Sequence, residues 1–448
     1  MSDAVAAGLA AFVDERPPSS PEARHEAARR LLDVFALAVS SSPDHAVQVA
    51  HSLAEPRGTD DGVTIWGRDG RCDLLGAVLA NGVGARYRDM NDAYFNRESL
   101  HPSDMVPALA GLAESRQASV GALLDAICVA YDVAVDMADT WRTSSRGADH
   151  VNLIRFGTVA GAARLLRLDP ECTLQAFAIA ASSGIATRQT RRGQLTMWKG
   201  WAAAEAGVAG LRAVAMAAAG AHGPTLAFTG DQGFQVLAVD EATWVEQWPF
   251  RGAGREHSRI LDTHLKVYPV GYLGQAVAEV GLDLHRQLDG VPPVQATIRT
   301  YARAKQIMGD PEKWVPRSAE TADHSLPYIA ALALVHGRVD VDTVPRRWDD
   351  PAVTKLLAAV SVDVDEELTA GYPEQMPVRL EVTTEDGAQR AAEVRWPRGH
   401  ARRPLPDDEL ARRGVQMLEP TFGARADDLV ARILAHDEDQ PAARLWQA

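Results

Sequence analysis

The chain has 448 residues, 46% hydrophobic and 24% charged, which is typical of a globular protein long enough for two or three domains. Its formal net charge of −14 argues against nucleic acid or an anionic membrane as a partner, and restricts an anionic small molecule to a locally positive pocket. The three cysteines lie far apart in apolar segments, which indicates buried free thiols and a reducing cytoplasm. No signal peptide or membrane-spanning segment is expected.

The first 55 residues carry apolar side chains at helical spacing, as in Leu31, Leu32, Phe35 and Val39, and predict helices. A short strand is expected at Val63–Trp66. The same helical spacing predicts further helices over the ranges 71–86, 118–140, 155–167, 171–184 and 201–223. Small side chains dominate the last of these helices, so we expect close helix packing around it, and Gly223-Pro224 should end it.

After about residue 270 the pattern changes from helical spacing to a mixture of helices and alternating strands. Alternation predicts strands within the segments 294–302, 360–368 and 378–396, with Asp386-Gly387 as a hairpin turn. One helix is expected over 322–337, and helices return from about residue 405. The predicted fold is mainly α, with domains over 1–268 (helical), 269–400 (α+β) and 401–448 (helical).

The polar segment from Arg86 to Asp104 lies between two apolar helices, and its buried polar groups need partners or a cavity. In this segment Asp89, Asn91 and Asp92 could supply a general base, or form only an Asx-turn. His101 precedes a helix start that Ser103 is expected to cap. An imidazole there could bind a carboxylate or transfer a proton, or be purely structural.

Other candidate groups stand where polar breaks enter helices. His150 is a lone histidine at such a helix entry. Like His101, it could bind a carboxylate, transfer a proton or be purely structural. Only five of the 46 Lys and Arg residues are lysines, so arginine is the usual cation of this chain. A lysine can therefore reflect a need for an ammonium group that loses and regains a proton. Lys199, between two tryptophans, and Lys266, just before a proline, fit that role, although a surface lysine would look the same. Tyr328 follows an Asp-His pair and is either functional or a core aromatic.

Nucleotide-binding glycine loops, zinc motifs and the GxSxG nucleophile motif are absent from the sequence. The sequence therefore gives no support for a nucleotide cofactor, a zinc site or a serine nucleophile.

Six segments together resemble the MmgE/PrpD family, which includes 2-methylcitrate dehydratase, cis-aconitate decarboxylase and iminodisuccinate epimerase. They are RYRDMNDAYFNRESLHPSDMVPALAGLAE, DHVNLIRFGTVAGAARLL, RQTRRGQLTMWKGWAAAEAG, LKVYPVGYLGQ, DPEKW…ETADHSLPYIAALAL and WPRGHARRPL. The resemblance runs from about residue 25 to 420 and is most similar to the dehydratase branch. It implies a large all-helical domain built from both chain ends, a smaller α+β lid, a homodimer, and chemistry that needs no metal and no organic cofactor.

The resemblance also implies the site and the reaction. The family's active-site residues fall on Asp89, His101, His150, Lys199, Lys266 and Tyr328, and substrate contacts are expected from Arg88, Asn91 and Ser103. The implied reaction is proton loss next to a carboxylate of a hydroxy polycarboxylate such as 2-methylcitrate, followed by β-elimination of hydroxide. The alternatives are decarboxylation of an unsaturated tricarboxylate, epimerisation of an amino or imino dicarboxylate, and a non-catalytic binding protein.

The chain departs from the dehydratase pattern at three positions. Close dehydratases tend to have Thr where this chain has Ala93. They also tend to have an acid and a histidine where it has Gly271 and Leu273. The loss of these groups removes hydrogen-bonding capacity near the site and suggests a substrate with different polar groups.

Overall fold

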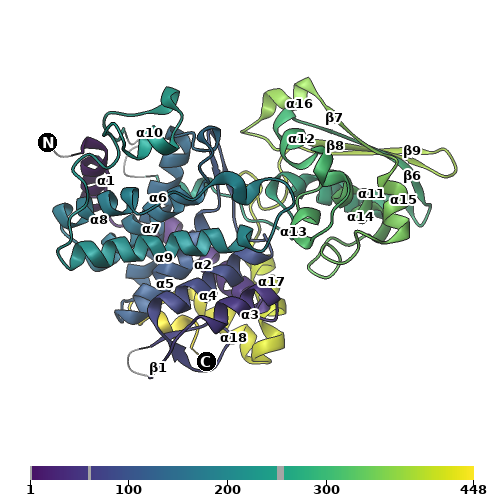
Figure 1. Cartoon of the computed structure of the whole chain (residues 1–448). Helices are drawn as coiled ribbons and strands as arrows, with labels where there is room; N and C mark the ends of the chain where they lie inside the picture. The colour runs from purple at the N-terminus through teal and green to yellow at the C-terminus, as the bar shows by residue number, and fades with distance from the viewer. Residues whose placement is uncertain (1–2, 59–61, 250–256, 448) are drawn as a thin grey trace.

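The computed structural model describes residues 3–58, 62–249 and 257–447. It has two lobes, and both chain termini lie in the larger, helical lobe (Figure 1). The hydrophobic core of the helical lobe combines residues from Val5 to Leu265 with residues from Leu405 to Trp446. A second core, of the small lobe, takes most of its residues from the range 270–382. The mainly α fold is confirmed. Along the chain, the core of the helical lobe ends at Leu265, the core of the small lobe runs from Val270 to Val382, and the helical core resumes at Leu405. The domain boundaries at residues 269 and 401 remain predictions.

The helical lobe consists of helices whose first turns are often capped by a polar side chain. Ser20, Asp73 and Ser119 each accept a hydrogen bond from a backbone N–H of the helix that follows. The helices are α1 (Ala4–Glu15), α2 (Pro21–Ser40), α3 (His45–Ser52), α4 (Leu74–Tyr87), α5 (Val106–Ser115), α6 (Val120–Thr140), α7 (Val151–Leu166), α8 (Pro170–Ser182), α9 (Trp198–Ala218), α10 (Phe234–Ala238), α17 (Asp407–Phe422) and α18 (Arg425–Ala435). Three small antiparallel elements, β1 (Pro56–Arg57), β2 (Val63–Thr64) and β3 (Arg71–Cys72), form one sheet, and β4 (Tyr94–Phe95) pairs with β5 (Ser99–Leu100).

Close packing of α9 against α4 and α7 places the start of α9 beside the polar segment. A Cβ added at Gly82 would lie 2.8 Å from the Ala204 Cβ, and one at Gly210 would lie 2.8 Å from the Thr158 Cβ. A Cβ at Gly200 would lie 3.3 Å from the Tyr87 backbone. Only small residues permit such contacts, so the expected role of the small side chains is confirmed.

Two local expectations in this lobe are wrong. Helix α9 ends at Ala218, five residues before Gly223. Ser103 does not cap α5: it lies in a 3-10 turn, and its hydroxyl accepts a hydrogen bond from Asn91 instead. The Ser103 hydroxyl bonds to the buried Asn91 amide of the polar segment and not to a backbone N–H at the helix start.

The small lobe contains a four-stranded sheet with helices α11 (Gln275–Leu288) and α14 (Leu326–His336) packed against it (Figure 1). The strand order is β7-β6-β8-β9, and only β6 and β7 run parallel. Alternate residues of β8 are buried, as the sequence pattern predicts. The strands are β6 (Pro293–Thr300), β7 (Val360–Val364), β8 (Val378–Thr384) and β9 (Gln389–Val394), and the other helices are α12 (Ala302–Met308), α13 (Ala319–Ala322), α15 (Pro351–Leu357) and α16 (Glu366–Gly371).

The chain crosses between the lobes twice, and the two crossings are bonded together. The Leu265 N–H donates to the Gly399 carbonyl at 2.9 Å, where a Cβ on residue 399 would lie 2.1 Å from the Leu265 oxygen. The His264 and His400 rings stack at 4.0 Å. His264 also exchanges two backbone hydrogen bonds of 2.8 Å with Ala93. These bonds hold Lys266 next to the polar segment.

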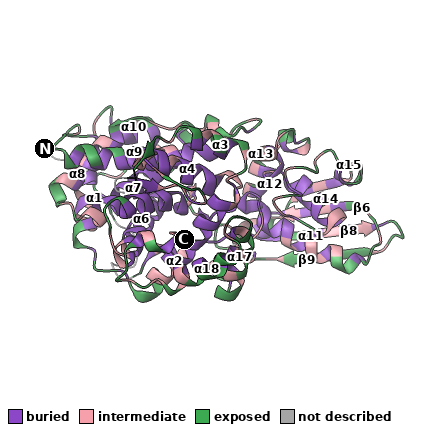
Figure 2. Cartoon of the chain, turned by 90° about the horizontal axis from the view of Figure 1, so that it is seen from below, coloured by how far each residue is buried: buried purple, intermediate pink, exposed green. Residues whose placement is uncertain are grey.

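Burial is concentrated at the helix packing centre and at the inner face of the small sheet (Figure 2). Cys72 and Cys128 are buried free thiols, whereas Cys172 is only partly buried, in contrast to the prediction. Within the described residues, no helix is both long and apolar enough to cross a membrane.

Candidate active site

Asp89 lies at the centre of a buried ionic cluster. It follows the end of α4 with a left-handed backbone (φ 53°) and is fully buried. Its Oδ1 pairs with Arg86 and accepts a hydrogen bond from Lys266 Nζ at 2.5 Å, and its Oδ2 lies 3.1 Å from Lys199 Nζ. Burial alone would raise the pKa of Asp89, but Arg86, Lys199 and Lys266 hold it well below its usual value. Asp89 is therefore an anion that orders three cations.

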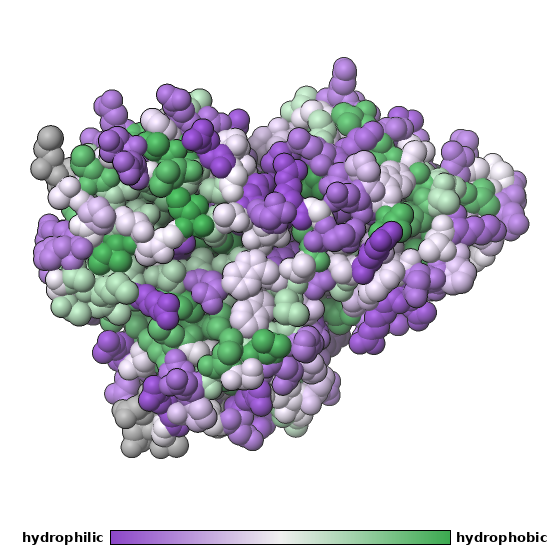
Figure 3. All heavy atoms as spheres, viewed as in Figure 1, coloured by the Kyte–Doolittle hydropathy of each residue, from purple (hydrophilic) through white to green (hydrophobic). Residues whose placement is uncertain are grey.

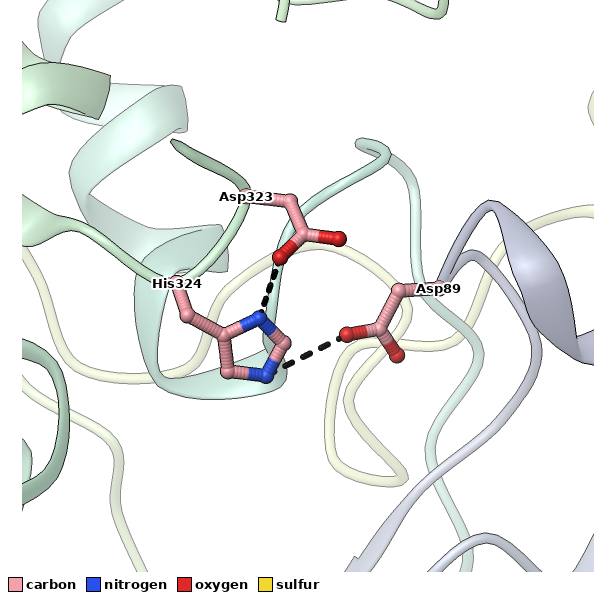
Figure 4. Close-up of side chains that lie close together, drawn as sticks. All are labelled: Asp89, Asp323 and His324. Carbon is pink, nitrogen blue, oxygen red and sulfur yellow. Dashed lines mark hydrogen bonds and ion pairs between the residues drawn. The ribbon is translucent and has the colours of Figure 1, made fainter. Parts of the chain in front are cut away.

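Lys199 connects Asp89 to the small lobe. Its Nζ lies 2.9 Å from Asp323 Oδ2 and 3.3 Å from His324 Nδ1. The His324 ring lies between two carboxylates, paired with Asp323 through Nδ1 and 3.3 Å from Asp89 Oδ2 through Nε2 (Figure 4). Burial and Lys199 lower the pKa of His324, against the opposing effect of Asp323. We call Arg86, Asp89, Lys199, Lys266, Asp323 and His324 the inner cluster.

Lys266 is the most deeply buried cation of the inner cluster. Its side chain is fully inaccessible, and its Nζ also donates to the Asp89 carbonyl at 2.8 Å. Burial lowers its pKa to about 8, although Asp89 acts in the opposite direction. Lys266 can thus lose its proton not far above neutral pH.

His101 is held as a neutral imidazole with a fixed tautomer. Its Nδ1 lies 2.6 Å from the Asp92 carbonyl oxygen, which can only accept, so Nδ1 carries the proton and Nε2 the lone pair. Burial, Arg86 and Lys266 lower the pKa of His101 well below its usual value. The Asp92 side chain is itself fixed by Tyr131, whose hydroxyl donates at 2.8 Å.

His150 lies beside His101, with ring centroids 5.7 Å apart. Its Nδ1 lies 3.2 Å from Asp149 Oδ1, while its buried Nε2 has no hydrogen-bond partner among the described residues. Burial lowers its pKa to about 3, so this ring is neutral at pH 7.

A cavity of about 1150 Å³ lies between the two lobes, lined by residues of both. In the space-filling view, hydrophilic side chains gather where the lobes meet (Figure 3). Cationic side chains outnumber acidic ones in the lining: the cations are Arg86, Arg97, Arg142, Arg188, Arg191, Arg192, Lys199, Arg303 and Lys313, and the acids are Asp89, Glu98, Asp310 and Glu312. An acidic protein thus has a locally positive cavity, which suits an anionic ligand.

Five of the lining arginines form no ion pair among the described residues, and two of them, Arg97 and Arg303, donate instead to the Thr140 carbonyl and to Gln306 Oε1. Arg142, Arg188 and Arg192, which we call the rim arginines, form no side-chain hydrogen bond or ion pair with another described residue. Burial lowers the pKa of Arg188. Glu98, the buried acid nearby, is satisfied instead by the backbone N–H groups of Thr143 and Ser144.

The predicted site residues divide into two sets. Asp89, His101, His150 and Lys199 line the cavity, and Lys266 contacts Asp89 directly behind it. The remaining candidates, Tyr328, Arg88, Asn91 and Ser103, do not line the cavity.

Each of these four has a structural partner instead. The Tyr328 hydroxyl donates to the Val344 carbonyl at 2.9 Å, so it is a core aromatic with a satisfied hydroxyl. Arg88 pairs with Asp44 at 2.7 Å, and Asn91 donates to Ser103 at 3.0 Å. A direct contact of these side chains with a ligand in the cavity therefore has no support in this geometry.

The sequence reasoning missed Arg86, His324 and the rim arginines. His324 stands in the quoted segment ETADHSLPY, beside the chosen Tyr328, so the signal was present. Arg86 opens the polar segment, but the chain has so many arginines that none stands out by type.

Asp89, Asp323 and His324 place three ligand atoms close enough together to hold a metal ion. Lys199 Nζ already lies 3.1, 2.9 and 3.3 Å from atoms of these three residues. A metal ion at this point would have to displace the ammonium group, so the donor set fits Lys199 better than a metal.

Two family models match the chain: the MmgE/PrpD N-terminal domain over residues 7–247 and the MmgE/PrpD C-terminal domain over residues 268–437. The chain is 26% identical to the 2-methylcitrate dehydratase of Escherichia coli K12 over 366 residues, which cover 77% of the chain and 74% of that relative. It is 26% identical to the 2-methylcitrate dehydratase-like protein oryR of Aspergillus oryzae over 415 residues (86% and 82%). It is 27% identical to the alkylcitrate dehydratase phiI of a fungal species over 356 residues (72% and 69%). The chain belongs to the MmgE/PrpD family.

Proposed function

We propose that the protein is a cofactor-independent hydro-lyase that dehydrates a hydroxy polycarboxylate such as 2-methylcitrate. Relatives that carry dehydratase names across most of both chains support this reaction class. The positive cavity supports a polycarboxylate as the substrate class, since the rim arginines form no ion pair with a carboxylate of the described residues.

The observation that carries the proposal is the neutral His101 beside the inner cluster. Its Nδ1 proton is committed to the Asp92 carbonyl, so Nε2 remains free to accept a proton from a substrate carbon. Asp89 is a poor base because Arg86, Lys199 and Lys266 stabilise its anion. We therefore assign the base role to His101, and Asp89 orders the cations. His150, whose Nε2 also has no partner among the described residues, is the second candidate for the base.

Removal of a proton next to a carboxylate places negative charge on that carboxylate as an enediolate. Lys199 lines the cavity and is fixed by Asp89 and Asp323, so its charge is already in place when the enediolate forms. The electron pair then expels the β-hydroxyl, which needs a proton to leave as water. Lys199 Nζ is the acid we assign to this step, and Tyr328 takes no part.

An end-point assay tests the proposal with 2-methylcitrate, citrate and cis-aconitate as substrates. Alkene formation is followed by ultraviolet absorbance and carbon dioxide release in parallel. Alkene without carbon dioxide supports the dehydratase, whereas carbon dioxide from cis-aconitate would replace it with a decarboxylase.

A base variant locates the chemistry. We expect His101→Asn to lower kcat by about 10²–10⁴-fold. His25→Asn, at a partly exposed histidine that contacts His436 and Asp407, is the matched control. Equal activity of His101→Asn and wild type would remove His101 as the base.

The homodimer implied by the family resemblance is part of the proposal. Light scattering coupled to size exclusion should give twice the chain mass of 48.2 kDa. A mass of one chain would contradict it.

A further inference from the structure

The two lobes contribute unequally to the positive charge of the cavity. Among the described residues, the small lobe supplies two Arg or Lys side chains to the lining, Arg303 of α12 and Lys313 of a 3-10 turn (Pro311–Trp314), and the helical lobe supplies the rest. Arg303 donates to Gln306 Oε1, on its own helix, at 3.0 Å. An anion between the lobes gains most from donors on both sides, so the partners of Lys313 matter for binding.

The Lys313 ammonium is buried without a carboxylate partner. The residue is 4% exposed, and its side chain forms no ion pair with a described residue. Within the described parts of the chain, its one side-chain hydrogen bond runs from Nζ to the Gly193 carbonyl of the helical lobe, at a long 3.4 Å. Asp310 and Glu312 also line the cavity, but Asp310 accepts from the Lys313 backbone N–H and not from the ammonium. An ammonium has three protons to donate, so most of its hydrogen-bonding capacity is unused.

The backbone of Lys313 is held from two sides. Its N–H donates to Asp310 Oδ1 at 3.2 Å, and its carbonyl accepts from the Ser325 hydroxyl at 2.5 Å. Ser325 directly follows His324 of the inner cluster, and Gly193 directly follows one of the rim arginines. Lys313 is therefore a fixed cation between the inner cluster and the rim, on the small-lobe side of the cavity.

The residue type agrees with a binding role. Arginine is the usual cation of this chain, and only five of its cationic residues are lysines. Two of them, Lys199 and Lys266, belong to the inner cluster, and Lys313 is the third at the cavity. The other two, Lys305 and Lys355, do not line it. A compact ammonium with three donors suits a carboxylate in a confined place.

We propose that Lys313 binds a substrate carboxylate from the small-lobe side and so selects substrates with three carboxylates. The inference rests on the proposed function for the substrate class, and on the unpaired ammonium for the contact. Lys199 faces the carboxylate at which the enediolate forms, the rim arginines take a second, and Lys313 takes the third. Lys313 is a binding residue and takes no part in proton transfer.

Binding to the full chain tests this contact without turnover. Tricarballylate has three carboxylates and no hydroxyl to eliminate, and glutarate and methylsuccinate carry two carboxylates on the same three-carbon frame. In calorimetry, wild type should prefer tricarballylate, and Lys313→Met should weaken its binding by about 10–100-fold, the worth of a hydrogen bond between charged groups. The two dicarboxylates should lose less, so the preference for three carboxylates shrinks.

A matched control is Lys305→Met, at a partly buried lysine of α12 outside the cavity lining, which should bind all three ligands as wild type does. Three results would overturn the proposal: no binding of tricarballylate by wild type, unchanged affinity in Lys313→Met, or an equal loss for the three ligands.

A merely structural role for Lys313 predicts a different result. If it only ties the lobes together through Gly193, Lys313→Met should lower the melting temperature of the ligand-free protein and leave the affinity for tricarballylate unchanged. If it binds substrate, removal of an unpaired buried charge should leave that temperature unchanged or raise it. Lys313→Arg keeps the charge and should recover part of the affinity that Lys313→Met loses.

Turnover separates failure of this inference from failure of the proposed function. With a citrate that the protein dehydrates, Lys313→Met should raise KM by about 10–100-fold and change kcat far less. If no citrate is dehydrated, the proposed function fails, while the binding series with tricarballylate still decides the contact. If a citrate is dehydrated and Lys313→Met keeps the KM of wild type, the contact fails and the dehydratase stands.

Discussion

The inner cluster and the rim of the same cavity both contain several cations, but only those of the inner cluster are neutralised. Lys199 and Lys266 both contact Asp89, and Lys199 also contacts Asp323. The rim arginines, Arg188 among them, contact no carboxylate among the described residues.

The difference separates two tasks that a site for anionic substrates must perform. Paired charges are held in fixed positions, so they can stabilise charge that develops during the reaction without moving. Unpaired charges are better placed to attract the carboxylates that the substrate brings with it. Changes in the inner cluster should therefore affect kcat and stability, and changes at the rim should affect KM.

The largest effect on activity is expected from Lys199→Met. The change removes the charge nearest the enediolate and the proposed acid, so kcat should fall about 10³-fold. Lys355→Met, at an exposed lysine of α15, is the control and should keep full activity. Unchanged turnover by Lys199→Met would remove this lysine from the mechanism.

The largest effect on stability is expected from Asp89→Asn. Asparagine tolerates the left-handed backbone of φ 53°, so the loss comes from the buried cations left without their anion. The free energy of unfolding should fall by about 3 kcal/mol, measured by urea denaturation. Asp407→Asn breaks pairs of a half-exposed carboxylate and should cost less than about 1 kcal/mol. Equal losses in the two variants would contradict the distinction between buried and exposed pairs.

The pH dependence should reflect Lys266 on the alkaline side. With a pKa of about 8, this lysine loses its proton as the pH rises through that value, and Asp89 then loses one of its cations. We expect kcat/KM to fall about fivefold between pH 8 and pH 9. ¹⁵N-labelling of the five lysines should show one Nζ signal that titrates near pH 8. Five signals that all titrate near the usual value of about 10.4 would contradict the assignment.

A smaller effect is expected at the rim. Arg188→Gln removes one unpaired charge and should raise KM about tenfold, with kcat within about twofold of wild type. Arg286→Gln, at an arginine whose side chain is 74% exposed on α11, is the matched control. A fall in kcat at constant KM would instead show that Arg188 acts in the chemical step, as we expect of the inner cluster.

Local patterns predicted most elements because helices and strands depend on short-range spacing. The ends of α9 and the cap of α5 were wrong because contacts from distant segments decide them. The same limit applies to the site. Asp89 and Lys266 are 177 residues apart and meet only because the lobe crossings are bonded together.

Residue type helped to predict the site for lysine, which is rare in this chain, and failed for arginine, which is common. The scarcity of lysine drew attention to Lys199 and Lys266, which the structure brings to one carboxylate. Arg86 occupies the same cluster, but one arginine among so many carries no signal of its own. His324 was overlooked because its neighbour Tyr328 was chosen from the same motif.

The smallest effect is expected from Tyr328→Phe, which tests whether the motif or the geometry identifies the acid. The hydroxyl donates to the Val344 carbonyl at 2.9 Å, and Tyr328 is absent from the cavity lining. Loss of this one hydrogen bond should lower the free energy of unfolding by about 1 kcal/mol and leave kcat within about twofold of wild type. A fall in kcat of a hundredfold or more, with stability preserved, would require the small lobe to rearrange when substrate binds and would assign the proton-donor role to Tyr328 in place of Lys199.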